Sequence, residues 1–208
     1  MKHSKIILAV LICAVIFGSC SKSEEMKPME DSMSMEGSMS MNDNASSTAA
    51  PKKIEASASK STVLEFSTID LDGNTVTNEI FSKYDLTLVN VWGTFCGPCK
   101  VELPALEAAY KEYAKKNCNV IAITIDLSKE DTSTLDLAKE IWKDSGCTFK
   151  ALYSVPEFAA VTDTLTGVPT SFFVDKKGAI VKGSFHTGAL DLEGFKKFFD
   201  KHLGMMMK

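Results

Sequence analysis

Two cysteines separated by two residues, Cys96 and Cys99, form the clearest chemical pattern in this 208-residue chain. They belong to a Cys-Gly-Pro-Cys sequence that follows the apolar run 86–92 and begins a helical pattern. A cysteine at a helix N-terminus faces unpaired N–H groups and the positive end of the helix dipole, which lower the pKa of its thiol. The second cysteine, one turn further on, can attack a mixed disulfide at the first. The spacing predicts thiol–disulfide exchange with Cys96 as the nucleophile and Cys99 as the resolving cysteine.

Zinc binding is the main competing use of this cysteine pair. A structural zinc ion needs four ligands, and the chain has neither a second C-x-x-C pair nor a spaced pair of histidines. The ligand set cannot be completed, so we expect neither a metal nor another cofactor in the domain.

Short apolar runs alternate with helical patterns from residue 61 onward, which predicts one α/β domain over residues 61–208. The run 86–92 is apolar almost throughout, as in a central strand that is buried on both faces. An Asp-Gly-Asn turn at 72–74 predicts a hairpin near the start of the domain. The expected strands are 63–69, 75–77, 86–92, 120–125, 149–153, 170–175 and 179–184, and the expected helical segments are 98–116, 133–145, 156–161 and 191–203.

Residues 86–104 (LTLVNVWGTFCGPCKVELP) and 167–170 (GVPT) resemble the thioredoxin superfamily, and within it the membrane-tethered TlpA/ResA-like thiol-disulfide oxidoreductases. The resemblance implies a thioredoxin-like fold, with a central mixed sheet flanked by helices and an N-terminal β-hairpin. It also implies that Pro169 is cis and lies beside the reactive cysteine, where Val168 can offer its N–H and C=O groups to a substrate strand. The substrate-binding residues that it implies are Trp92, Phe95, Gly97, Pro98, Val168 and Pro169.

Three positions depart from the usual patterns. Asn90 falls where thioredoxins place a buried acid beneath the cysteines, and Phe95 replaces the commoner Trp before the nucleophile. Glu102 is the nearest carboxylate in sequence, and we weigh two interpretations of it: a general acid or base, or an exposed helix charge. Asn90 and Glu102 are therefore candidate modulators of the cysteines.

Three other functions compete with disulfide reduction. A disulfide-forming oxidase would use the same cysteines, although the Gly97-Pro98 pair resembles reducing thioredoxins. A copper-handling protein on a thioredoxin-like fold would use Cys96, Cys99 and His186, but such proteins have C-x-x-x-C spacing. A thiol peroxidase is disfavoured because T-x-x-C is absent around Cys96.

Two further cysteines stand at equivalent places before neighbouring strands. Cys118 precedes the strand 120–125 by two residues, and Cys147 precedes the strand 149–153 by two. In the thioredoxin superfamily these strands are parallel neighbours, so the two cysteines would lie at the same end within disulfide reach. We expect a structural disulfide here, with two buried free thiols as the alternative.

His186 follows the last expected strand, which in the thioredoxin fold ends on the same side of the sheet as the active site. We expect the loop 185–188 to form one wall of the substrate groove, with His186 close to Cys96. A protonated imidazole there would stabilise the thiolate. The alternative is a solvated histidine without a role.

Residues 1–19 have the features of a signal peptide: two early lysines, an apolar run over 6–17, and small residues before Cys20. An apolar helix of twelve residues, about 18 Å long, is too short to cross a bilayer core of roughly 30 Å. The small-small-Cys ending resembles a bacterial lipobox, which implies lipidation of Cys20. The alternatives are an uncleaved anchor, or ordinary secretion with an incidental Cys20. We therefore expect an extracytoplasmic protein that a lipid anchors to the cell membrane.

Residues 20–60 are rich in Ser, Ala, Lys, Glu and Met, and have few of the residues that build a core, so we expect a disordered tether. Six methionines recur at short spacing in this segment: Met26, Met29, Met33, Met35, Met39 and Met41. Clustered thioethers can bind Cu(I), but a low-complexity linker gives the same pattern.

The chain has 23 basic residues, all of them lysine, against 27 acidic residues, which gives a net charge of −4. Without arginine the chain cannot form the bidentate contacts that read guanine or phosphate, so we expect no nucleic-acid partner. The resemblance implies two kinds of partner, disulfides of exported proteins as substrates and a membrane electron donor of the CcdA/DsbD type. We expect a monomer.

Overall fold

The computed structural model describes residues 62–206, so the predicted signal peptide (1–19), the site at Cys20 and the tether (20–60) lie outside the described residues. Two sheets form within this range. A two-stranded sheet pairs β1 (Ser67–Ile69) with β2 (Thr75–Thr77), which confirms the predicted hairpin. The main sheet has five strands in the order β5-β4-β3-β6-β7.

The three strands on one side of the main sheet are parallel to each other. They are β3 (Leu86–Trp92), β4 (Cys118–Thr124) and β5 (Lys150–Tyr153). Strand β6 (Thr170–Asp175) runs antiparallel to β3, and β7 (His186–Thr187) runs antiparallel to β6. The sheet is therefore mixed, with β3 at its centre and every residue of β3 buried.

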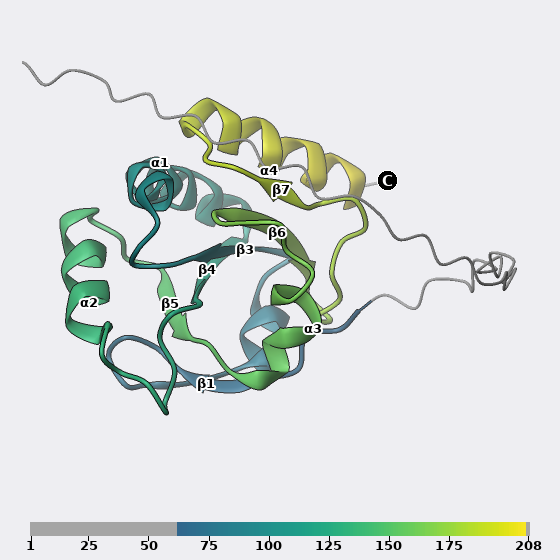
Figure 1. The fold of residues 1–208 in the computed structure, drawn as a ribbon. Coiled ribbons are helices and arrows are strands. Elements are labelled where there is room, and N and C mark those ends of the chain that lie inside the picture. Colours follow the sequence, from purple (N-terminus) through teal and green to yellow (C-terminus); the bar gives the residue numbers. More distant parts are fainter. Residues whose placement is uncertain (1–61, 207–208) are drawn as a thin grey trace, which may run out of the picture. The chain divides into compact units, whose positions relative to one another are not determined.

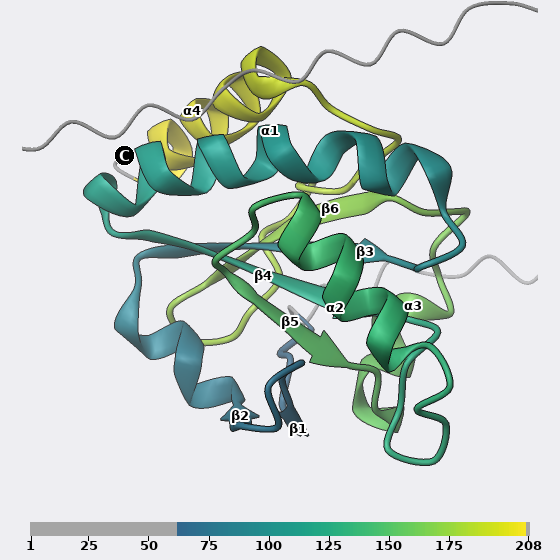
Figure 2. The same ribbon diagram turned by 90° about the vertical axis from the view of Figure 1, so that its left-hand side faces the viewer.

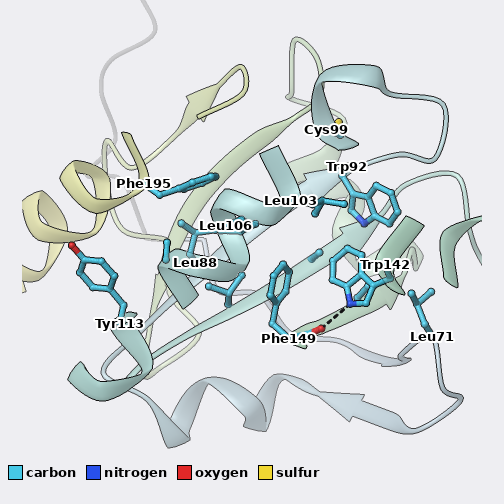
Figure 3. Packing of buried hydrophobic residues seen from close by; sticks show 14 of the residues in the cluster. Leu71, Leu88, Trp92, Cys99, Leu103, Leu106, Tyr113, Trp142, Phe149 and Phe195 are labelled. Carbon is cyan, nitrogen blue, oxygen red and sulfur yellow. Dashed lines mark hydrogen bonds between the residues drawn. The ribbon is translucent and has the colours of Figure 1, made fainter. Parts of the chain in front are cut away.

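Helices cover the two faces of the main sheet (Figures 1 and 2). On one face, α1 (Gly97–Tyr113), α2 (Leu135–Asp144) and α4 (Leu192–Met206) enclose a core that includes Trp92, Leu103 and Phe195. Figure 3 shows this core, in which the Trp142 indole N–H donates to the carbonyl oxygen of Phe149. The opposite face is covered by the hairpin, the 3-10 helices η1 (Asn78–Lys83) and η3 (Pro156–Phe158), and α3 (Ala159–Thr162).

The hairpin predicted over 170–184 forms only in part. β6 is present, but residues 179–184 make only isolated bridges, and the last strand is instead His186–Thr187. The chain turns at Gly183, which has a φ of +71°. The main-chain N–H of Phe173 in β6 therefore donates to the Ser184 hydroxyl and not to a carbonyl oxygen of a neighbouring strand. His186 therefore lies inside the last strand rather than after it.

Candidate active site

Cys96 and Cys99 form a disulfide at the start of α1, with their Cα atoms 5.3 Å apart. Cys96 is the N-cap of the helix, and its sulfur accepts the N–H of Cys99 at 3.2 Å. The exposed fraction of Cys96 is 6%, whereas Cys99 is completely buried. An incoming sulfur atom can therefore reach Cys96 only, and the main-chain donor beside it would stabilise a thiolate there.

The peptide bond between Val168 and Pro169 is cis, as the resemblance implied. The carbonyl oxygen of Val168 lies 3.6 Å from Cys96 Sγ, so the loop before β6 stands directly beside the accessible sulfur. Pro169 itself is buried, and its carbonyl oxygen accepts the N–H of Gly188. The two motifs that carried the resemblance are adjacent in the structure, although Cys96 and Val168 are 72 residues apart in sequence.

Of the predicted substrate-binding residues near the cysteines, three are exposed and one is not. Phe95 is 67% exposed, and Gly97 and Pro98 also reach the surface. Trp92 is completely buried, with its ring 5.3 Å from that of Trp142 between the sheet and α2. The prediction that Trp92 contacts substrate is therefore wrong, because its position in β3 points the side chain into the core.

Asn90 and Glu102 meet beneath the first turns of α1. Glu102 is only 3% exposed, so the interpretation of an exposed helix charge is wrong. One of its carboxylate oxygens accepts from the Asn90 amide at 2.8 Å, and the other accepts the N–H of Leu190 at 3.0 Å. Burial raises the pKa of this carboxyl group to about 7, although both hydrogen bonds oppose the shift. Glu102 therefore titrates near neutral pH, one helical turn from Cys99.

The Asn90 amide also donates to the Ser171 hydroxyl at 3.1 Å, while its own oxygen is buried and has no partner among the described residues. Ser171 thus contacts the partner of Glu102, and Leu190 contacts Glu102 itself. The sequence contained no signal for either residue, because both lie more than 60 positions downstream and are brought in by β6 and by the loop before α4.

A second carboxylate, which was not among the predicted site residues, holds the loop before the cysteines. Asp126, after β4, accepts the Thr94 N–H at 3.1 Å and also accepts the Thr94 hydroxyl. Its own carbonyl oxygen accepts the Thr134 hydroxyl at the start of α2. Asp126 therefore ties Thr94, two residues before the accessible cysteine, to the ends of β4 and α2. Its place after a buried strand that is parallel to β3 was the available signal.

Replacing Asp126 with alanine should lower the free energy of unfolding by about 2 kcal/mol, because the N–H and hydroxyl of the buried Thr94 lose a charged acceptor. Urea unfolding of the oxidised protein measures this. Asp126→Asn is the matched control, since an amide oxygen can still accept one of the two hydrogen bonds and should recover part of the loss. An unchanged stability in Asp126→Ala would show that the Thr94 contact carries no energy.

Cys118 and Cys147 are free thiols, so the predicted structural disulfide is wrong. The parallel pairing of β4 with β5 starts only at Ile121 and Lys150, and Cys147 lies in the loop before it. The Cys147 thiol is directed to the carbonyl oxygen of Leu103 at 3.8 Å, while the Cys118 thiol is directed to that of Lys116 at 3.6 Å. The equal offsets in sequence therefore do not bring the two sulfur atoms together.

Both thiols should be detectable by titration with a thiol reagent. We define the reference protein as the full chain in detergent with Cys13→Ser and Cys20→Ser, in which Cys96, Cys99, Cys118 and Cys147 remain. Unfolded in its oxidised form, it should release two thiols. In the folded state both should react slowly, because burial raises the pKa of Cys118 to about 11 and that of Cys147 to about 12. No thiol on unfolding would indicate a Cys118–Cys147 bond.

His186 packs against α4, with its ring 5.9 Å from that of Phe198. Within residues 62–206, neither a hydrogen bond nor a ring contact joins it to the active-site disulfide. The loop 185–188 adjoins the site at its end, through the hydrogen bonds from Gly188 to Pro169 and between the hydroxyl groups of Thr187 and Thr170. A modulating role for His186 stays a prediction that these contacts do not support.

Within residues 62–206, no three His, Cys, Asp or Glu side chains are grouped so that they could hold a metal ion. The same range contains no helix long and apolar enough to cross a bilayer.

Residues 60–182 match the AhpC/TSA family. The chain belongs to the AhpC/TSA family. The matched range of this AhpC/TSA chain contains both cysteines of the disulfide and the cis-proline. The resemblance to the thioredoxin superfamily is thereby confirmed.

Proteins named thiol-disulfide oxidoreductase ResA are similar to this AhpC/TSA chain. The one from Bacillus cereus is 32% identical over 98 residues, which are 45% of this chain and 51% of that protein. The one from Oceanobacillus iheyensis is 25% identical over 198 residues, which are 93% of this chain and 84% of that protein. The chain thus spans about half the length of the B. cereus relative.

The fold is also that of solved thioredoxin-like proteins. A thiol:disulfide interchange protein of the thioredoxin family from Chlorobium tepidum has a TM-score of 0.57 at 22% identity, and the match covers 71% of this chain and 99% of that one. At this identity the likeness concerns the fold, and it confirms the predicted thioredoxin-like architecture.

Proposed function

We propose that this protein is a thiol-disulfide oxidoreductase that reduces disulfides in exported proteins. The observation that carries the proposal is the Cys96–Cys99 disulfide at the N-terminus of α1, with its accessible sulfur beside Val168. The name shared by the ResA relatives supports the same activity.

The reaction begins with the dithiol form. The Cys96 thiolate attacks one sulfur atom of a substrate disulfide, and the other substrate sulfur leaves and takes up a proton. Cys99, as a thiolate, then attacks Cys96 in the mixed disulfide. The second substrate sulfur leaves and is protonated, and the Cys96–Cys99 bond closes. Two electrons and two protons have passed to the substrate, and the oxidised pair is the product state.

Each neighbour of the cysteines has a part in this cycle. The Cys99 N–H stabilises the Cys96 thiolate, and the main chain of Val168 holds the substrate strand. Cys99 is buried and must lose its proton before it attacks. Glu102 is suited to accept that proton, because its pKa of about 7 leaves it partly ionised at neutral pH.

The location and the electron donor are part of the same proposal. The apolar run 6–17 and the small residues before Cys20 favour export and lipidation, which would place the domain outside the cytoplasm. The oxidised pair must be reduced again by two electrons, and a membrane dithiol donor of the CcdA/DsbD type would supply them across the bilayer. The protein would act as a monomer.

Reduction of insulin by the reference protein, driven by a chemical dithiol, tests the activity. A midpoint potential from equilibrium with glutathione then gives the direction of the reaction. A value of about −270 mV supports a reductant, whereas a value of about −120 mV would indicate the disulfide-forming oxidase instead. An absence of insulin reduction would contradict the proposal.

A further inference from the structure

A groove of about 560 Å³ opens beside the active-site disulfide. Its lining includes Phe95, which directly precedes the accessible cysteine, and Val168, whose carbonyl oxygen lies 3.6 Å from Cys96 Sγ. A peptide segment joined to Cys96 by a disulfide would therefore lie over this groove. Its volume falls within the range of about 300–1,000 Å³ that is typical of ligand clefts.

Hydrogen bonds between separate segments hold the groove in shape. The contact between Thr94 and Asp126 joins the wall that carries Phe95 to the wall that carries Ile125. A further main-chain bond, from Ser154 to Leu127, ties the end of β5 to the segment after β4. The groove is thus preformed in the oxidised protein and does not require the substrate to order its walls.

The lining combines an apolar floor with one negative charge. Ile125 and Leu165 supply aliphatic surface, and Phe95 adds an aromatic ring that is 67% exposed. Asp163 is the one charged side chain that lines the groove, and within residues 62–206 no ion pair or side-chain hydrogen bond involves it. A lysine or arginine complements this arrangement, because its aliphatic stem can cover apolar surface while its charged head meets a carboxylate.

We infer that this groove selects substrate segments in which a basic residue and an apolar residue lie next to the disulfide cysteine. The occupant is an extended segment of a client protein. Asp163 is the residue that favours a positive charge in that segment. This inference rests on the proposed function and adds a substrate class to it. Asp163 acts on binding and not on the chemistry of the cysteines, since it follows α3 and, within residues 62–206, no hydrogen bond or ion pair joins its side chain to either cysteine.

Two disulfide-linked peptides that differ only in a Lys or a Glu near the cysteine test the inference. At low salt the reference protein should reduce the Lys peptide with a kcat/KM about threefold to tenfold higher, the range expected for an exposed charge pair that is attractive in one peptide and repulsive in the other. Asp163→Asn should bring the ratio close to one, and Asp163→Lys should reverse it. Salt at about 0.5 M should reduce all these differences.

Two controls separate binding from chemistry. Asp144→Lys, an exposed substitution on α2 outside the groove, should keep the preference of the reference protein. The small neutral 2-hydroxyethyl disulfide should be reduced at the same rate by all variants, because it carries no charge that residue 163 could attract or repel. If that disulfide is reduced but the peptide ratio is the same in the reference protein and in Asp163→Lys, the inference is overturned and the proposed function stands. If the reference protein does not reduce it, the proposed function falls and the inference falls with it.

Discussion

Replacing Cys96 with serine is expected to lower the rate of insulin reduction by at least about 10³-fold, to the background of the chemical dithiol. A serine hydroxyl cannot form the mixed disulfide, and Cys99 cannot substitute for Cys96 because it is completely buried. The measurement is the initial rate of insulin precipitation in the reference protein and in the Cys96→Ser variant.

Cys118→Ser is the matched control, since it removes a thiol that the proposed mechanism does not use. This variant should keep the rate of the reference protein, because burial raises the pKa of Cys118 to about 11 and leaves almost no thiolate at neutral pH. Equal rates in the reference protein and in Cys96→Ser would rule out Cys96 as the nucleophile.

The second large effect concerns stability and pH at Glu102. Burial raises the pKa of this carboxyl group from 4.5 to about 7 in the folded protein. Between these two values the folded state holds a proton that the unfolded state has released, so stability falls as the pH rises through this window. At about 1.4 kcal/mol per pKa unit, the loss is complete above the folded pKa and amounts to about 3 kcal/mol.

Glu102→Gln removes this titration and keeps an oxygen that can accept from Asn90 or from Leu190. Relative to the reference protein, the free energy of unfolding of this variant should therefore rise by about 3 kcal/mol between about pH 4 and about pH 8. Urea unfolding of the oxidised proteins across this range measures the change. Glu112→Gln, at an exposed site on the same helix, gives the baseline for removing a carboxylate. A parallel pH dependence in Glu102→Gln and the reference protein would show that Glu102 does not titrate in this window.

The sequence predicted the centre of the fold well, because the centre depends on strong local patterns. The run 86–92 is buried at every residue, as its continuous apolar character indicated, and α1 begins at Gly97, between the two cysteines. The turn at 72–74 formed the predicted hairpin. These elements position the cysteines, so the main features of the site could be predicted together with them.

The errors arose where the outcome depends on contacts between distant segments. One of the two interpretations of Glu102 was an exposed helix charge, yet this side chain is buried and accepts the N–H of Leu190, 88 residues away. The disulfide expected between Cys118 and Cys147 required the pairing of β4 with β5 to extend three residues further than it does. The contact between Asp126 and Thr94 likewise joins residues 32 apart that share no local pattern.

Trapping of the reaction intermediate tests the central claim most directly. The Cys99→Ser variant of the reference protein keeps the accessible nucleophile but lacks the thiol that resolves the mixed disulfide. Incubated with a disulfide-bonded peptide, it should accumulate a covalent adduct whose mass is that of the protein plus the peptide, and peptide mapping should place the bond at Cys96. No adduct, or an adduct at Cys118 or Cys147 instead, would contradict the proposed thiol–disulfide exchange.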